Sequence, residues 1–268
     1  MSSRFILALA QTGAVLYDKE QNIKKAEVLM SAAASGGARA IIFPEMYLTG
    51  YMVYDRLAEL AEPLDGIYIG KLAALARRFN LVTVCGFPET NPGALPYNSA
   101  CVIEADGTIL GCYRKTHLFG EESKYYTPGR EFYVFETSLG ELGVMICFDS
   151  EFPEVSRILT LQGAKLIVSP TANMDPYSEY QSVYIRSRAM ENGVFVAIAN
   201  TVGADEKFSY FGQSSVADPV GRLLCTGGPG EELLLADIDL NLVRVRDEAL
   251  NYRKHRRPQL YGLLTQEQ

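Results

Sequence analysis

The sequence predicts an α/β fold in which mixed β-sheets are covered by helices. Short apolar runs alternate along the chain with segments whose apolar residues recur at helical spacing. Some neighbouring runs are joined by tight turns, whereas others are separated by a whole helix. Because hairpins pair strands antiparallel and helical crossovers pair them parallel, each predicted sheet contains both arrangements. No low-complexity linker divides residues 1–268, so we expect a single domain.

In the first half of the chain, the strands are predicted from continuous apolar runs, and Pro44 stops the second of them. The helices are predicted because apolar residues fall on one face, as Ile23, Ala26 and Met30 do in the first. A hairpin follows, with its turn at Asp106-Gly107. In chain order these segments are strand 5–12, helix 22–34, strand 38–45, helix 66–79, strand 81–87 and hairpin 98–115.

The second half repeats this alternation. A turn at 138–140 separates its first two strands, and Pro153 favours the start of a helix. From about residue 240 onward we expect a short helix and an extended tail, which carries the basic run 253–257. The preceding segments are strands 132–137 and 141–148, helix 153–162, strand 165–170, helix 177–191, strand 194–201, hairpin 214–227 and strand 232–240.

The composition excludes several classes of function. A net charge of -7 argues against a nucleic-acid partner, because phosphate binding needs a basic surface. No apolar stretch approaches the roughly 20 residues that a membrane span requires, and the first apolar segment is too short for a signal peptide. Five irregularly spaced cysteines form no disulfide framework, so we expect a cytoplasmic protein. Two histidines are too few for a histidine-based zinc site, and we expect no metal.

Three predicted strands end on a side chain that can take part in chemistry, namely Glu45, Lys115 and Cys147. Taken singly, each has an ordinary alternative: a loop carboxylate, an edge-strand lysine and a cysteine packed in the core. Open α/β sheets bind ligands at the carboxyl ends of their strands. We therefore predict that these three side chains meet in one cavity.

Together the three groups supply the parts of acyl transfer from an amide. A carboxylate can take the thiol proton and pass it to the leaving nitrogen, while a fixed cation holds the oxyanion. The acidic residues Asp149, Glu151 and Glu154 follow Cys147 closely and disfavour a thiolate. We therefore expect Lys115 to lower the thiol pKa against this acidic loop.

The segments FPEMYLTGY, YRKTHLF and GVMICFDSEFPE occur in this order and resemble the signature blocks of the nitrilase superfamily, the carbon–nitrogen hydrolases. The resemblance extends from ALAQT near the start to RRPQLYG near the end. It implies a four-layer αββα sandwich with two mixed sheets and a Glu-Lys-Cys triad that uses neither a metal nor a cofactor. It also implies a homodimer or higher homo-oligomer, contacted through the helix after the cysteine and the C-terminal tail.

Matched block by block, the resemblance implies that Glu45 is the general base, Lys115 the oxyanion stabiliser and Cys147 the nucleophile. Many members carry a second glutamate shortly after the lysine block. This chain offers Glu121 or Glu122 there, and the spacing favours Glu122, which would orient the substrate amide and Lys115. The alternative is that this glutamate is a solvated loop acid.

The pocket predicted around these residues is apolar, with a few polar groups. The backbone N–H of Phe148 would be the second oxyanion donor, by the same resemblance. Tyr51 and Phe119 lie in loops that should rim the pocket, and Asn173 and Asp175 should edge it. Asp175 could instead contact an amino group on the substrate. Such a pocket suits an uncharged aliphatic or aromatic amide.

The residues after the cysteine narrow the substrate class. Hydrolases of N-carbamoyl-D-amino acids carry an arginine pair where this chain has Ser150-Glu151, and ω-amidases carry an arginine at the second place. Nitrile-cleaving members have Trp-Glu where this chain has Phe148-Asp149. Because this chain lacks the arginines of the other two classes, it also lacks one obvious clamp for a substrate carboxylate. We therefore expect an amidase that releases ammonia from a small uncharged linear amide. The alternatives are a nitrilase, an N-carbamoyl amidohydrolase, an acyltransferase and a catalytically silent interaction protein.

Overall fold

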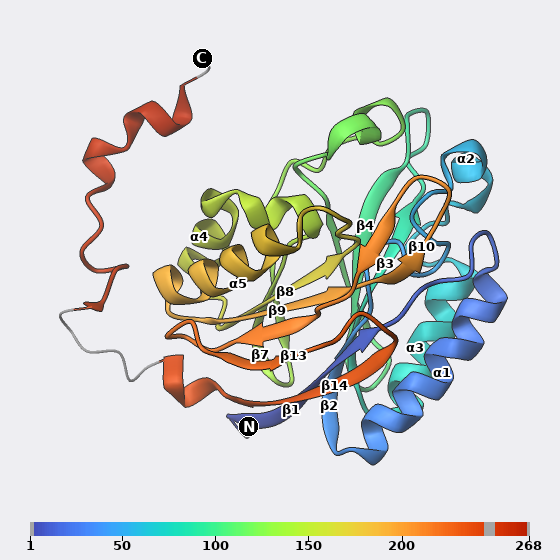
Figure 1. Ribbon diagram of the computed structural model, residues 1–268, viewed down its shortest axis with the longest axis horizontal. Coiled ribbons are helices and arrows are strands. Elements are labelled where there is room, and N and C mark those ends of the chain that lie inside the picture. Colours follow the sequence, from blue (N-terminus) through green and yellow to red (C-terminus); the bar gives the residue numbers. More distant parts are fainter. Residues whose placement is uncertain (1–2, 244–249, 267–268) are drawn as a thin grey trace.

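Two six-stranded mixed sheets lie face to face, and helices cover the outer side of each (Figure 1). This computed structural model describes residues 3–243 and 250–266. The mixed α/β sandwich predicted from the sequence is therefore confirmed. None of the described helices is both long and apolar enough to cross a membrane.

The first sheet has the strand order β14-β1-β2-β3-β4-β5. Strands β1, β2 and β3 are parallel, and the remaining neighbours pair antiparallel. Helices α1 and α3 cover its outer face (Figure 1), and the short helix α2 lies between them in the chain. The bounds are β1 Arg4–Gln11, α1 Lys19–Ser35, β2 Ala38–Ile42, α2 Leu57–Leu60, α3 Ile67–Phe79, β3 Val82–Glu89, β4 Tyr97–Ile103, β5 Ile109–Arg114 and β14 Glu232–Asp239.

The second sheet has the order β13-β12-β9-β8-β7-β6, with β7, β8 and β9 parallel. Helices α4 and α5 cover it, and a separate hairpin of β10 and β11 follows β9. The sequence analysis missed this hairpin, whose strands are three residues each. The bounds are β6 Val134–Thr137, β7 Gly140–Val144, α4 Pro153–Leu161, β8 Leu166–Thr171, α5 Ser178–Asn192, β9 Phe195–Asn200, β10 Val202–Ala204, β11 Ser209–Phe211, β12 Ser215–Ala217 and β13 Leu223–Thr226.

Strand β1 shows why the predicted strands are almost uniformly apolar. Leu7 and Leu9 belong to the core between the two sheets, whereas Ala8 and Ala10 belong to the core under α1 and α3. All four side chains are fully buried. A strand covered on both faces has no solvent side, so its apolar run is continuous rather than alternating.

Several predicted boundaries differ from the structure, among them the end of β2, which lies at Ile42 rather than at residue 45. Helix α1 begins at Lys19, ahead of the predicted residue 22, because the Asp18 side chain caps it by accepting the N–H of Gln21. The strand predicted over 141–148 ends at Val144, so Cys147 is not a strand residue. Cys147 instead opens a 3-10 turn, Cys147–Glu151, with a φ of 47°. The apolar run overestimates the strand because Met145 and Ile146, which follow β7, and the first two residues of the turn are also apolar.

The C-terminal part of the chain lies beyond β14. The short helix predicted there corresponds to a 3-10 turn at Leu240–Val243, and the rest of that prediction falls on residues 244–249, outside the described residues. Residues 250–266 lie apart from the four layers (Figure 1). Most of their side chains are exposed, although Asn251, Tyr252 and Arg253 line a cavity together with residues of the sandwich.

Candidate active site

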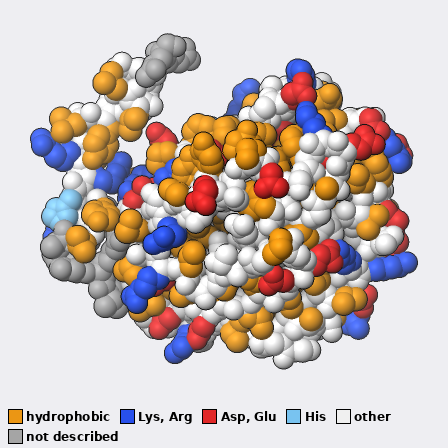
Figure 2. All heavy atoms as spheres, in the orientation of Figure 1, with side chains coloured by type: hydrophobic (Ala, Val, Ile, Leu, Met, Phe, Trp, Pro, Cys, Tyr) orange, Lys and Arg blue, Asp and Glu red, His pale blue; other side chains and the backbone are white. Residues whose placement is uncertain are grey.

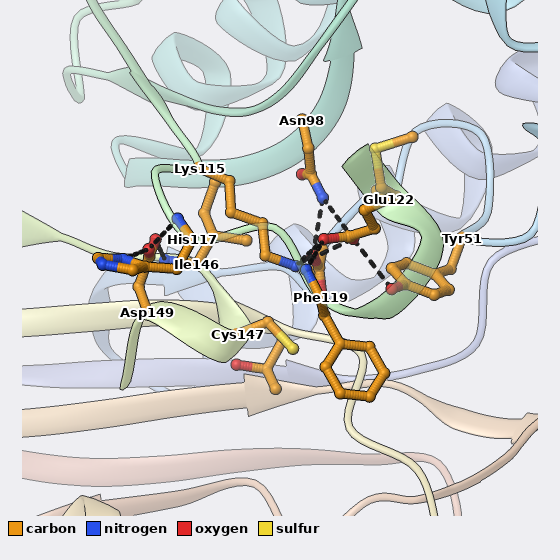
Figure 3. Close-up of polar contacts among 12 residues, drawn as sticks. Tyr51, Asn98, Lys115, His117, Phe119, Glu122, Ile146, Cys147 and Asp149 are labelled. Carbon is orange, nitrogen blue, oxygen red and sulfur yellow. Dashed lines mark hydrogen bonds and ion pairs between the residues drawn. The ribbon is translucent and has the colours of Figure 1, made fainter. Parts of the chain in front are cut away.

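Glu45, Lys115 and Cys147 all lie shortly after the carboxyl end of a strand, β2, β5 and β7 respectively. The strands belong to the two different sheets, so the cluster forms at one end of the sandwich. Figure 3 shows the Lys115 ammonium among Asn98, Glu122 and Tyr51, with the Cys147 sulfur beside it. The side chains of Glu45, Lys115 and Glu122 are all buried.

Lys115 lies between two carboxylates. Its Nζ is 2.8 Å from Glu45 Oε1, 2.8 Å from Glu122 Oε2 and 3.0 Å from Glu122 Oε1. Burial alone lowers the pKa of Lys115, but the negative charges of Glu122 and Glu45 outweigh it and raise that pKa well above its ordinary value. The ammonium is therefore a permanent positive charge.

The two carboxylate oxygens of Glu45 differ in their hydrogen bonding. Oε1 accepts from Lys115 and from Asn98 Nδ2 at 2.8 Å, while Oε2 has no hydrogen-bond partner among the described residues. Burial raises the pKa of Glu45, as does Glu122, while Lys115 and Asn98 lower it, and the balance is a raised pKa. An oxygen with these properties is suited to accept and return a proton. Asn98 was missed from the sequence, where an amide at the start of a buried strand was the only signal.

Only one of the two candidate glutamates reaches the cluster. Glu122 is buried and accepts hydrogen bonds from the Tyr51 hydroxyl at 2.9 Å and the Phe119 backbone N–H at 2.7 Å. Glu121 is exposed and pairs with Lys124 and another surface lysine. Tyr51 therefore acts on the Glu122 carboxylate.

The Cys147 thiol is buried and lies 3.2 Å from Asn173 Oδ1. Burial raises the pKa of Cys147, Glu45 raises it further, and Lys115 lowers it too little to compensate, so the pKa stays well above its ordinary value. Lys115 thus lowers the thiol pKa as expected, but burial and the charge of Glu45 outweigh its effect. In the resting site the sulfur is a protonated thiol.

The backbone at Cys147 turns sharply. A φ of 47° places a residue with a Cβ in the left-handed region that such residues rarely adopt. The turn holds because the Asp149 carboxylate accepts the Ile146 N–H at 3.0 Å and the Cys147 N–H donates to Ser169 Oγ at 3.2 Å. This turn lifts the thiol out of the strand and presents it to the cluster.

The acidic loop after Cys147 does not act on the thiol as the sequence led us to expect. Asp149 is buried and accepts hydrogen bonds from the Tyr113 hydroxyl, the Thr116 hydroxyl and the His117 N–H at 2.8 to 2.9 Å. His117 in turn stacks on Phe152. Glu154 is exposed. The carboxylate that opposes the thiolate is therefore Glu45, while Asp149 joins the lysine loop to the cysteine turn.

A chain of amides fixes the orientation of Asn173. Its Nδ2 donates to Gln181 Oε1 at 2.8 Å, and Gln181 Nε2 donates to the Gln213 carbonyl at 2.9 Å. A backbone carbonyl can only accept, so Gln181 turns its oxygen toward Asn173, and Asn173 turns its own oxygen toward the thiol. The sequence analysis missed Gln181, which looks like any polar residue of a surface helix.

Aromatic rings wall one side of the cluster. The Phe119 ring packs edge-on against Phe148 at 5.4 Å and Tyr177 at 6.4 Å between ring centroids. Phe148 is the second residue of the 3-10 turn, where a backbone N–H has no acceptor within the turn. Asp175 is exposed, and its backbone N–H bonds to the Ser209 carbonyl, so its side chain lies outside the buried cluster.

Comparisons with known proteins find relatives along nearly the whole chain. A family model described as carbon-nitrogen hydrolase matches residues 6–246. An (R)-stereoselective amidase of a Pseudomonas species is 35% identical over 88% of this chain and 85% of its own length. An omega-amidase of Homo sapiens is 34% identical over 91% of this chain and 92% of its own length.

A solved structure matches as well. The amidase from Nesterenkonia sp. AN1, in a form with the acetamide moiety of fluoroacetamide added covalently at the active-site cysteine, superposes with a TM-score of 0.86. It is 26% identical, and the match covers 96% of this chain and 95% of that one.

Proposed function

The chain belongs to the carbon–nitrogen hydrolase family, and we propose that it hydrolyses a small, linear, uncharged amide to a carboxylic acid and ammonia. The observation that carries this proposal is the buried cluster in which Lys115 bridges Glu45 and Glu122 beside the Cys147 thiol. The amidases among its relatives support the reaction type. We assign catalytic roles to these four residues, with the reaction passing through a thioester on Cys147.

The first half-reaction forms the thioester. Because the thiol is protonated at rest, Glu45 Oε2 removes its proton as the sulfur attacks the amide carbon. A lysine ammonium has three N–H donors, so Lys115 can serve both carboxylates and still donate to the oxyanion. The Phe148 N–H supplies the second donor.

The second half of the reaction runs through the same carboxylate. Glu45 gives its proton to the leaving nitrogen, the C–N bond breaks and ammonia departs. A water molecule then loses a proton to Glu45 while its oxygen attacks the thioester. Collapse of the tetrahedral intermediate breaks the C–S bond, and the sulfur recovers its proton. The raised pKa of Glu45 suits a group that must be a base and an acid in turn.

The preference for an uncharged substrate rests on the loop after Cys147. Burial raises the pKa of Glu151, which stands where an arginine clamps carboxylates in some members. The nearby cation Arg188 donates to the Ser150 and Glu151 backbone carbonyls at 2.9 and 2.8 Å and is therefore occupied. Together with the ring of Phe119, these groups favour an apolar acyl chain.

A substrate panel tests this proposal. Ammonia release is measured with matched sets of simple amides, amides with a distal carboxylate, N-carbamoyl amino acids and nitriles. We expect the simple amides to have the highest kcat/KM. Hydrolysis of nitriles without hydrolysis of the matched amides would support a nitrilase instead, and exclusive use of the carboxylate-bearing amides would support an omega-amidase.

We also propose that the four layers form a single domain. In addition, the chain is proposed to form a homo-oligomer whose subunits contact each other through α4, α5 and the segment after about residue 240. Apolar side chains gather over these helices in Figure 2. Tyr180, Val183 and Met190 on α5 are exposed by 46 to 59%. Exposed apolar patches of this kind favour a protein partner. Light scattering of the purified chain measures the number of subunits.

The pH dependence of kcat/KM tests the role of Glu45. Glu45 must be ionised to act as a base, so activity is lost as the pH falls through its raised pKa. Asn98 donates to the ionised carboxylate and lowers this pKa, so the substitution Asn98→Leu is expected to move the acid limb to higher pH. Asn91→Leu, which removes an exposed loop amide, is the control and should leave the limb in place. An acid limb that stays where it was in Asn98→Leu would contradict the assignment.

A further inference from the structure

A small cavity reaches Glu45 from the side of the β1 and β9 loops. Its volume is about 60 Å³, and its lining includes Glu45 and Tyr51 together with residues that follow β1 and β9, such as Ala14 and Thr201. Neither Cys147 nor Lys115 is among the described residues that line it. The cavity therefore reaches the base, while neither the nucleophile nor Lys115 forms part of its wall.

The cavity extends from the surface to a buried carboxylate. Leu16 and Ala204 line its outer end and are exposed, whereas Glu45 at its inner end is buried. One Glu45 oxygen, Oε2, lacks a hydrogen-bond partner among the described residues. A water molecule occupies about 30 Å³ in the liquid, so the space holds roughly two waters and excludes an amide with an aromatic or long aliphatic chain.

The outer end is polar and negatively charged. Asp205 lines it and accepts the Tyr210 hydroxyl and the backbone N–H groups of Lys207 and Phe208. A carboxylate held there repels anions, including the carboxylic acid product, but does not hinder neutral water. The cavity thus admits water, while its size excludes large amides and its charge repels anions.

Hydrolysis of the thioester needs such a route. In the mechanism proposed above, the acyl group on Cys147 lies beside the aromatic rings of Phe119 and Phe148, where the substrate is proposed to bind. Water that must reach Glu45 Oε2 at this stage has to pass the acyl chain or arrive from another side. The cavity provides the other side.

We propose that this cavity is the inlet for the hydrolytic water, which it delivers to Glu45 Oε2 while the acyl chain still occupies the substrate pocket. The proposal rests on the thioester mechanism proposed above. In the step that it serves, the water oxygen bonds to the thioester carbon and the water proton passes to Glu45 Oε2. The C–S bond then breaks, and the proton returns to the sulfur. Narrowing the inlet should therefore slow deacylation and leave acylation unchanged.

The test narrows the cavity with Ala14→Phe and, separately, with Ala204→Phe. The control Val15→Phe places the same ring on a neighbouring exposed residue that is not among those lining the cavity. Acyl-enzyme formation and decay are followed directly by rapid quenching and intact-protein mass. We expect the decay to slow about tenfold and kcat and KM to fall together, with kcat/KM within about twofold of the wild type.

Each result bears on one proposal. Unchanged acyl-enzyme decay in a variant that forms the acyl-enzyme at the normal rate would overturn the inlet, as would equal slowing in Val15→Phe. If the rates of acylation and deacylation fell by the same factor, the cavity would instead be part of the site that binds the substrate. Absence of any acyl-enzyme in the wild type would refute the thioester mechanism itself. Ala204→Phe, on a different loop, answers the question if Ala14→Phe does not fold.

Discussion

Replacement of Cys147 by alanine is expected to reduce amide hydrolysis about 10⁶-fold, while the protein keeps its fold. The substitution removes the only atom that forms a covalent bond with the substrate in the proposed mechanism. It costs little stability, because the thiol is a small group and the turn around it is held by Asp149 and Ser169. Ammonia release measures the activity, and thermal unfolding measures the stability.

Two further cysteine variants separate nucleophilic attack from packing. Cys225→Ala removes a half-buried thiol from β13 and is expected to retain full activity. Cys147→Ser is expected to be nearly as inactive as Cys147→Ala, because Glu45 is too weak a base to activate a hydroxyl. Intact mass should show an added acyl group only when Cys147 is present. Substantial turnover by Cys147→Ala would rule out the thioester.

Individual strands and helices were predictable from the sequence because a strand buried on both faces, such as β1, leaves a continuous apolar run. The end of β7 was not, since the apolar run continues past Val144 into the first residues of the turn. What makes Cys147 a turn residue is the Asp149 carboxylate binding the Ile146 N–H, a contact that periodicity does not encode.

In the candidate site, too, some residues were predictable from the sequence and others were not. Strand ends and family blocks singled out Glu45, Lys115 and Cys147, because such residues stand out against apolar surroundings. Asn98 did not stand out, since its importance comes from Glu45, which lies 53 residues away in the chain. Gln181 lies only eight residues from Asn173, but on a helix where a polar side chain is ordinary. The sign of the thiol pKa shift was likewise inaccessible, because it depends on how deeply the sulfur is buried.

Replacement of Lys115 by methionine is expected to lower kcat/KM by at least about 10³-fold and to destabilise the protein by about 3–5 kcal/mol. The loss of activity has two causes: the oxyanion loses a donor, and Glu45 is left beside Glu122 without the cation between them. Without Lys115, which lowers the pKa of Glu45, burial and the charge of Glu122 raise that pKa further, so less of Glu45 is ionised and able to accept a proton. The loss of stability follows because a buried charge is left uncompensated. Steady-state kinetics and urea unfolding measure the two effects.

Lys124→Met is the matched control, because Lys124 also pairs with a glutamate of the same loop, Glu121, but at the exposed surface. Surface pairs contribute little to stability, so this variant should behave like the wild type in both assays. A Lys115→Met enzyme that changed only in KM would contradict the oxyanion role, because a donor aimed at the transition state acts on kcat. A variant that lost stability but retained kcat would reduce Lys115 to a structural cation that separates Glu45 from Glu122.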